Sequence, residues 1–76
     1  MLSTNNLSNL NKGESAVVSD ISADGSMRRR LQDMGLIRGT CVTCVQKSPL
    51  GDPVAYLIKG AVIALRSEDS ACVQIC

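Results

Sequence analysis

Histidine, phenylalanine and tryptophan are absent from this 76-residue chain, and Tyr56 is its single aromatic side chain. Without histidine, neither a Ser-His nor a Cys-His nucleophile pair can form, and the sequence has no GxxxxGK[ST] phosphate-binding motif. The adjacent carboxylates Glu68 and Asp69 lie between two serines, a setting that suits capping a turn better than acid/base catalysis. We therefore expect no enzymatic activity.

A strong excess of charge is also missing, because eight Lys and Arg oppose seven Asp and Glu for a net charge of +1. Phosphate binding through counterion release usually requires a far more positive balance. The near absence of aromatic residues also removes the platform on which single-stranded bases stack. Nucleic acid is thus not an expected partner, and an adaptor that binds it through residues 28–30 is the least favoured hypothesis.

Long apolar runs are lacking too. The two strongest, Val54–Ile58 and Ala61–Leu65, are separated by Lys59 and Gly60, whereas a membrane span needs about 18 or more consecutive apolar residues. The start of the sequence has neither a basic stretch nor an apolar core, so it does not have the pattern of a signal peptide. We expect a cytoplasmic protein that associates with membranes only through a partner.

Apolar residues nevertheless make up 45% of the chain and are almost all aliphatic, which predicts one small domain with a light core. Residues 1–11 are rich in asparagine and serine. They predict a loosely packed N-terminal segment in which Leu7 and Leu10 pack onto the domain edge. Residues 12–76 are expected to form the folded domain.

One short amphipathic helix is predicted over about residues 24–34. Its apolar residues recur at i, i+4 and i+7 and form one stripe, made of Met27, Leu31 and Met34. If Gly35 is the left-handed residue after the helix, Leu31 and Leu36 make the hydrophobic contact of a Schellman motif.

The rest of the chain has the pattern of short β-strands. Five segments are rich in β-branched or alternating apolar residues, namely residues 13–21, 40–46, 54–58, 61–65 and 72–76. Lys59 and Gly60 join the third and fourth segments at the two-residue spacing of a hairpin. Five strands with one inserted helix predict a mainly β fold, a small barrel of the SH3-like or OB-like type.

The order of several short motifs is more specific than any one of them. The motifs are Arg30-Leu31, Met34-Gly35-Leu36, Gly39-Thr40, the SPLGDP loop at residues 48–53, Gly60 and Ala64-Leu65-Arg66. In this order and spacing the chain resembles the FeoA family over residues 28–75, and more loosely back to Leu7. The resemblance implies an SH3-like β-barrel with an inserted helix. It also implies a non-catalytic accessory or regulatory module for ferrous iron uptake that acts on the cytoplasmic region of the membrane GTP-binding transporter FeoB.

The SPLGDP loop is the first candidate for a partner contact. Pro49 and Pro53 restrict the backbone, so the loop is stiff for its length, and stiffness lowers the entropic cost of binding. Leu50, Gly51 and Asp52 form its tip. Either Leu50 contacts a partner, or it folds back onto the mouth of the barrel.

The second candidate is the helix face that carries Arg28 and Arg29, which lie off the apolar stripe. They could steer the domain towards an acidic partner surface, although a solvated helix face is the simpler explanation. Arg30 is expected to be structural, with its stem over the barrel and its guanidinium paired with an acid such as Asp33 at i+3.

The four cysteines suggest a second class of function, a module that binds iron(II) or zinc through thiolates, including as a dimer. The candidate ligands are Cys41, Cys72 and Cys76, since Cys44 aligns with Val42 in the apolar set of its strand. Regular strands oppose a shared site, because Cys41 and Cys44 point to opposite faces, and Cys72 and Cys76 share the solvent face about 13 Å apart. The favoured hypothesis therefore requires no cofactor.

Overall fold

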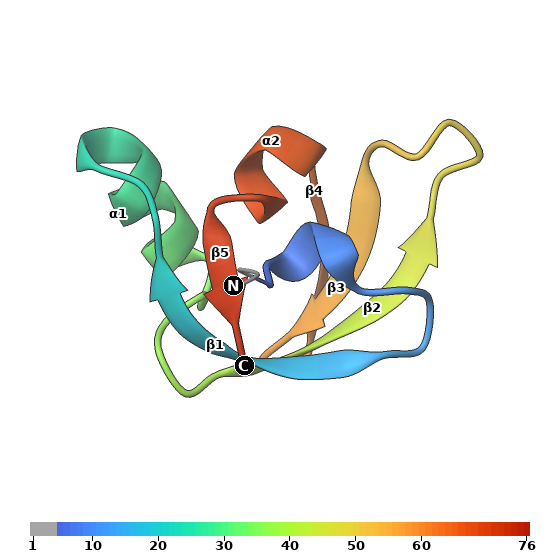
Figure 1. Cartoon of the computed structure of the whole chain (residues 1–76), viewed down its shortest axis with the longest axis horizontal. Helices are drawn as coiled ribbons and strands as arrows, with labels where there is room; N and C mark the ends of the chain where they lie inside the picture. Colours follow the sequence, from blue (N-terminus) through green and yellow to red (C-terminus); the bar gives the residue numbers. More distant parts are fainter. Residues whose placement is uncertain (1–4) are drawn as a thin grey trace.

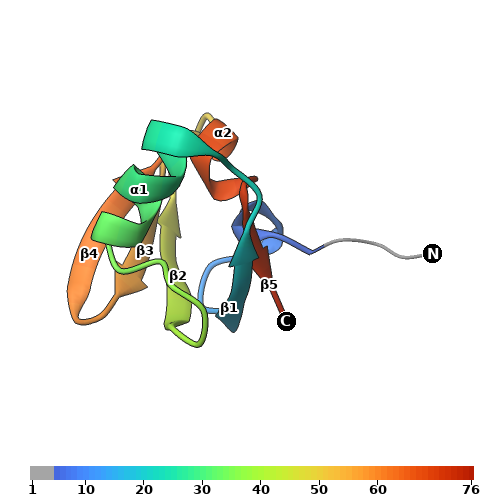
Figure 2. The ribbon, with the colours of Figure 1, turned by 90° about the vertical axis from the view of Figure 1, so that its left-hand side faces the viewer.

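The computed structural model describes residues 5–76 and consists of a five-stranded antiparallel sheet with two α-helices at one end (Figure 1). The strands are β1 (Ser15–Ile21), β2 (Cys41–Lys47), β3 (Val54–Ile58), β4 (Ala61–Leu65) and β5 (Val73–Ile75). The helices are α1 (Gly25–Asp33), α2 (Ser67–Ser70) and the short 3-10 helix η1 (Leu7–Asn9). The strand order is β4-β3-β2-β1-β5, and the sheet curls so that β2, β3 and β4 face β1 and β5 (Figure 2). The mainly β fold with one inserted helix, α1, is confirmed.

The hairpin between β3 and β4 forms as its two-residue spacing predicts. Lys59 has φ +49° and Gly60 has φ +84°, so both turn residues lie in the left-handed region that a type I′ turn requires. The pairing then runs without a shift from Ile58 opposite Ala61 to Val54 opposite Leu65. This hairpin gives the sheet its most regular part.

The end of α1 is the predicted Schellman motif. Gly35 has φ +100°, its N–H donates to the Gln32 carbonyl at 2.9 Å, and the Leu36 N–H donates to the Leu31 carbonyl at 3.1 Å. Leu31 and Leu36 are both fully buried. A Cβ atom on Gly35 would lie 3.3 Å from Ile58 Cγ2, so this position requires glycine both for its backbone angle and for the close approach of β3.

The described part of the N-terminal segment is packed, not loose. Leu7 is fully buried and Leu10 is 7% exposed, so both belong to the core, whereas the composition predicted that they would pack only onto the domain edge. The Leu7 carbonyl accepts a hydrogen bond of 3.1 Å from the buried Tyr56 hydroxyl, and the Asn5 carbonyl accepts one of 3.0 Å from the Ile75 N–H. Because the core has no Phe or Trp, these two leucines contribute part of the volume that larger side chains would otherwise fill. Residues 1–4 lie outside the described residues.

The core is aliphatic around a single aromatic ring. Its fully buried side chains include Tyr56, Leu7, Leu31, Leu36, Ile58, Leu65, Val18, Val42, Val73 and Cys44. Burial raises the pKa of the Tyr56 hydroxyl above its ordinary value of about 10. Over residues 5–76, no helix combines the length and the apolar composition needed to cross a bilayer.

Candidate partner-binding site

The loop between β2 and β3 is closed on itself and presents one leucine to solvent. The Ser48 hydroxyl and N–H both donate to the Pro53 carbonyl, at 2.6 and 3.3 Å, and the Gly51 N–H donates to the Ser48 carbonyl at 2.8 Å. Leu50 at the tip is 94% exposed. The alternative in which Leu50 folds back onto the barrel is therefore wrong, because the turn closes through its own backbone and leaves this side chain outside.

Asp52, another predicted contact residue, is engaged within the fold. Its carboxylate accepts a hydrogen bond of 2.7 Å from the Ser67 N–H, one of the free N–H groups in the first turn of α2. This bond fixes the loop to the chain that follows β4. Gly51 adopts φ +86° and supplies the turn that a residue with a side chain would strain.

Beside this loop lies a hollow of about 370 Å³ on the outer face of β2, β3 and β4. Its lining residues are Val45, Gln46, Ser48, Pro49, Pro53, Ala55, Val62 and Ala64. None of them is charged, and Val62 is 62% exposed. We call this feature the apolar hollow. Leu50 belongs to the same loop as three of the lining residues, Ser48, Pro49 and Pro53.

Sheet register explains how these side chains come together. Ala55 pairs with Ala64, and Leu57 pairs with Val62, so directly opposed residues put small apolar side chains on the outer face. The ladder shifts between Cys44 and Gln46, which leaves Val45 as the extra residue of a β-bulge. This surface was not predicted from the sequence. The segment AVIAL at residues 61–65 could have indicated it. This segment is apolar throughout, whereas a strand with one face in solvent alternates apolar and polar residues.

The arginines of α1 do not act as one patch. Arg28 and Arg29 are both exposed, but Arg28 Nη1 donates to the Ile21 carbonyl at 3.0 Å and is thereby held against the end of β1. Arg30 pairs with an acid, as predicted, but that acid is Asp69 of α2 at 3.1 Å, and Asp33 was the wrong choice of partner. Folding brings α2 beside α1 and offers Arg30 a carboxylate that is more buried than the one on its own helix.

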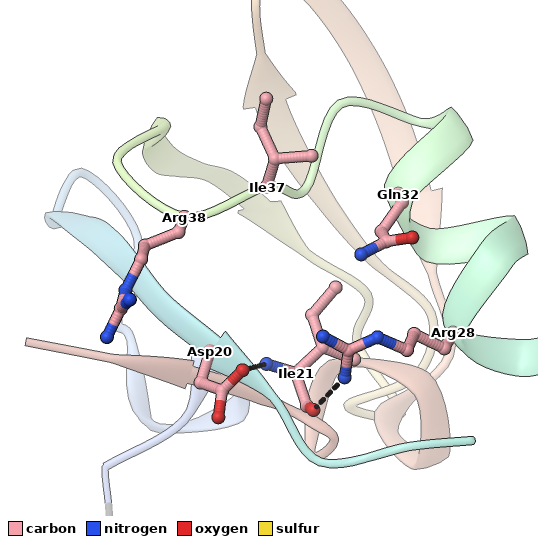
Figure 3. Close-up of a pocket in the computed structure, with 6 residues that line it drawn as sticks. All are labelled: Asp20, Ile21, Arg28, Gln32, Ile37 and Arg38. Atoms are coloured by element: carbon pink, nitrogen blue, oxygen red, sulfur yellow. Dashed lines mark hydrogen bonds between the residues drawn. The ribbon is translucent and has the colours of Figure 1, made fainter.

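A second hollow, of about 220 Å³, lies between α1, the end of β1 and the loop before β2 (Figure 3). It is lined by Asp20, Ile21, Arg28, Gln32, Ile37 and Arg38, and we call it the arginine hollow. Arg38 Nε donates to the Ser19 carbonyl at 3.2 Å, and Asp20 Oδ1 accepts the Ile21 N–H at 2.8 Å. Arg38 did not emerge from the sequence as a candidate, because it lies in a loop with no periodic pattern.

The cysteines are distributed over three environments. Cys44 is fully buried in the core, as predicted. Cys72 lies at the edge of the core and not on the solvent side, with its Sγ 3.4 Å from the Glu68 carbonyl oxygen. Cys41 and Cys76 are exposed, and both flank Val17 of β1 on its outer face.

This arrangement does not assemble the candidate ligands around one ion. Two strand spacings separate Cys41 from Cys76, or about 10 Å between backbones, whereas zinc–sulfur bonds are about 2.3 Å long. In the part of the chain that the structure describes, no three His, Cys, Asp or Glu side chains cluster closely enough to hold a metal.

Comparisons with known proteins agree on one family. The family model of the FeoA domain matches residues 5–75. A fusion of Fe(2+) transport protein A with the Fe(2+) transporter FeoB, from Porphyromonas gingivalis, is 39% identical over 69 residues, which cover 91% of this chain. The chain spans only 8% of the length of that relative.

Solved structures give the same result for the fold. The FeoA protein of Chlorobium tepidum is 33% identical, with a TM-score of 0.84 over 92% of this chain and 67% of its own. FeoA of Stenotrophomonas maltophilia, complexed with zinc and described as a prokaryotic SH3 domain protein, is 31% identical. Its TM-score is 0.83 over 93% of this chain and 88% of its own. Of the two barrel types left open by the strand pattern, the SH3-like type is confirmed.

Proposed function

The chain belongs to the FeoA family, and we propose on that basis that it is a non-catalytic accessory module of ferrous iron uptake. Its partner would be the cytoplasmic region of a FeoB-type transporter, which it meets in the cytoplasm and through which alone it associates with the membrane. The Porphyromonas gingivalis relative supports this partner, because there a homologous segment and a FeoB transporter form one chain. A covalent link keeps two modules at high effective concentration.

One observation carries the proposed mode of binding, namely that Leu50 is 94% exposed beside an uncharged hollow. A single exposed leucine is common on protein surfaces. Here, however, it stands on a loop closed by three hydrogen bonds, and three residues of that loop, Ser48, Pro49 and Pro53, line the apolar hollow. Such a surface loses little conformational entropy on association and suits an apolar segment of the partner.

The test is a calorimetric titration of the reduced, metal-free protein with the soluble GTP-binding region of the transporter. Leu50→Asp and Val62→Asp each place a charge against the apolar contact, and we expect each to weaken binding at least about tenfold, equivalent to roughly 1.4 kcal/mol. Both positions are exposed, so the free energy of unfolding should change by no more than about 0.5 kcal/mol.

Val17→Asp is the matched control, because Val17 is 41% exposed on the outer face of β1, away from the apolar hollow. Its affinity for the partner should equal that of the unaltered protein. If the folded Leu50→Asp and Val62→Asp variants bind as the unaltered protein does, the apolar hollow is not the docking surface.

The same titration, repeated with zinc or iron(II), tests the metal-binding alternative. A relative of this chain has been obtained with zinc, and Cys41 and Cys76 are exposed. We propose that no cofactor is required, so the affinity should not depend on either metal. Binding that appears only with metal, and disappears in a Cys41→Ser, Cys76→Ser variant, would instead assign the function to the thiols.

A further inference from the structure

The arginine hollow contains two cations without an acidic partner. The one ion pair recorded over residues 5–76 joins Arg30 to Asp69, so neither Arg28 nor Arg38 has a carboxylate oxygen within 4.0 Å. Unpaired arginines are common on surfaces, where water solvates them. These two differ in that both line the same hollow.

Both side chains are also held in place by the backbone of β1. Arg28 donates through Nη1 to the Ile21 carbonyl, and Arg38 donates through Nε to the Ser19 carbonyl. A guanidinium carries five N–H donors, so each arginine keeps most of its donors for a ligand. Because these bonds already restrict the side chains, less rotamer entropy is lost when a ligand binds.

The distribution of charge selects the shape of the ligand. Figure 3 shows Arg28 and Arg38 on opposite sides of the hollow, with Asp20 and Ile21 between them. A small anion placed midway would face the Asp20 carboxylate, which opposes its binding. An extended chain that carries one carboxylate to each arginine avoids this repulsion, and its backbone N–H groups are suitable donors for Asp20.

The remaining lining residues favour a peptide as well. Ile37, which is 42% exposed, supplies aliphatic surface, and Gln32 has a carboxamide that can both donate and accept. In an extended segment, residues i and i+2 point to the same side about 6.6 Å apart. A Glu-x-Glu sequence therefore presents two carboxylates to one surface.

We propose that the arginine hollow binds an extended acidic segment of a partner protein, with Arg28 and Arg38 each pairing with one carboxylate. The site is separate from the apolar hollow. Figure 1 places α1 and the loop between β2 and β3 on opposite sides of the molecule. The proposal goes beyond the proposed function, and it can be tested without the transporter.

The experiment is an NMR titration of the ¹⁵N-labelled protein with a capped peptide, Gly-Glu-Ser-Glu-Gly. We expect shifts confined to residues 19–21, 28–32 and 37–38, with affinity that falls as salt is raised because the contacts are ionic. A peptide with both glutamates replaced by glutamine, and inorganic phosphate, are titrated in parallel and should bind at least about tenfold more weakly.

Variants then assign the contact to residues. Arg38→Gln and Arg28→Gln should each weaken peptide binding several-fold, whereas Arg29→Gln, on the same helix but outside the hollow, should not. Each of these two variants also removes one bond to β1, and because the two bonds go to different carbonyls, either variant keeps the test valid if the other unfolds. The proposal is overturned by equal effects of Arg29→Gln and Arg38→Gln, by phosphate binding as tightly as the peptide, or by no localised shifts.

Discussion

The apolar hollow, of about 370 Å³, is larger than the arginine hollow, of about 220 Å³, and the two are built in different ways. The first lies on three consecutive strands, and its side chains are placed by the hydrogen-bonded ladder of β2, β3 and β4. The second gathers side chains from the end of β1, from α1 and from the loop that follows, and single arginine-to-carbonyl bonds hold it together. Side chains positioned by the hydrogen bonds of one sheet form a preformed surface. A surface shared between a strand, a helix and a loop depends on where the helix is anchored.

The anchors of α1 are few and identifiable. Leu31 and Leu36 bury its C-terminal end, Gly35 lets the chain pass close to β3, and Arg30 joins its exposed side to Asp69. Changes at these positions should alter the arginine hollow and leave the apolar hollow intact. Changes on the buried face of β3 should alter the apolar hollow and leave the arginine hollow intact.

The largest expected effect is that of Gly35→Ala. Alanine must adopt φ near +100°, which costs about 1–2 kcal/mol, and its Cβ would also meet Ile58 Cγ2 at 3.3 Å. We expect a loss of about 2–3 kcal/mol in the free energy of unfolding, measured by urea denaturation.

Gly51→Ala is its counterpart beside the apolar hollow. Gly51 has φ +86°, but no atom within 4 Å would meet its Cβ, so only the backbone strain of about 1 kcal/mol applies. Equal losses in the two variants would show that the Ile58 contact relaxes freely, and that α1 is not anchored at Gly35 as described.

A smaller effect is expected for Tyr56→Phe. Tyr56 lies on the buried face of β3, opposite the face that carries the apolar hollow. The variant removes one of the two hydrogen bonds that the Leu7 carbonyl accepts and leaves the other, from the Leu10 N–H at 3.1 Å, so we expect a loss of about 1 kcal/mol at neutral pH. Thermal unfolding with and without the substitution measures it.

The same variant should behave differently in alkali. Burial raises the pKa of Tyr56 in the folded state, so the folded protein holds this proton more tightly than the unfolded chain does. Its contribution to stability is complete below about pH 10 and is lost as the pH rises through the raised pKa. The advantage of the unaltered protein over Tyr56→Phe should therefore shrink above pH 10. A constant difference would mean that the Tyr56 hydroxyl is not buried.

The smallest effect is expected for Arg30→Gln, which removes the bond between α1 and α2. The Arg30 side chain is 58% exposed, so solvent screens the pair and its loss should cost at most about 0.5 kcal/mol. Melting temperatures at low and high salt should differ for the unaltered protein and agree for the variant. A loss above about 2 kcal/mol in the free energy of unfolding would mean that the pair between Arg30 and Asp69 anchors α1, and with it the arginine hollow, more strongly than an exposed ion pair does.

Elements set by neighbouring residues could be predicted from the sequence. Gly35 ended the helix where a left-handed residue was expected, and Lys59-Gly60 turned the chain between two strands of the predicted bounds. Both depend on backbone preferences within a few residues. The burial of Leu7 was underestimated because its partner, Tyr56, lies 49 residues away in the sequence.

The candidate sites show the same limit. The exposure of Leu50 was one of two open alternatives, since no local pattern tells whether a loop tip meets its own domain. The apolar hollow depends on the pairing of Ala55 with Ala64, and the arginine hollow depends on Arg38 meeting α1, so both are products of register and tertiary packing. Pairing Arg30 with Asp33 was wrong for this reason, because the sequence does not show that α2 brings Asp69 nearer.

The bonds between the two ends of the described chain also determine when the domain can be completed during synthesis. The pairing of β1 with β2 does not involve β5, but the other edge of β1 waits for residues 73–75, and so does the Asn5 carbonyl that receives the Ile75 N–H. As the chain leaves the ribosome, the β2–β3–β4 meander can form first from contacts close in sequence, while η1 and β1 remain open on one side. Completion of the domain is therefore one of the last events of translation of this segment, and a chain that stalls before residue 73 exposes Leu7 and Leu10 to chaperones and proteases.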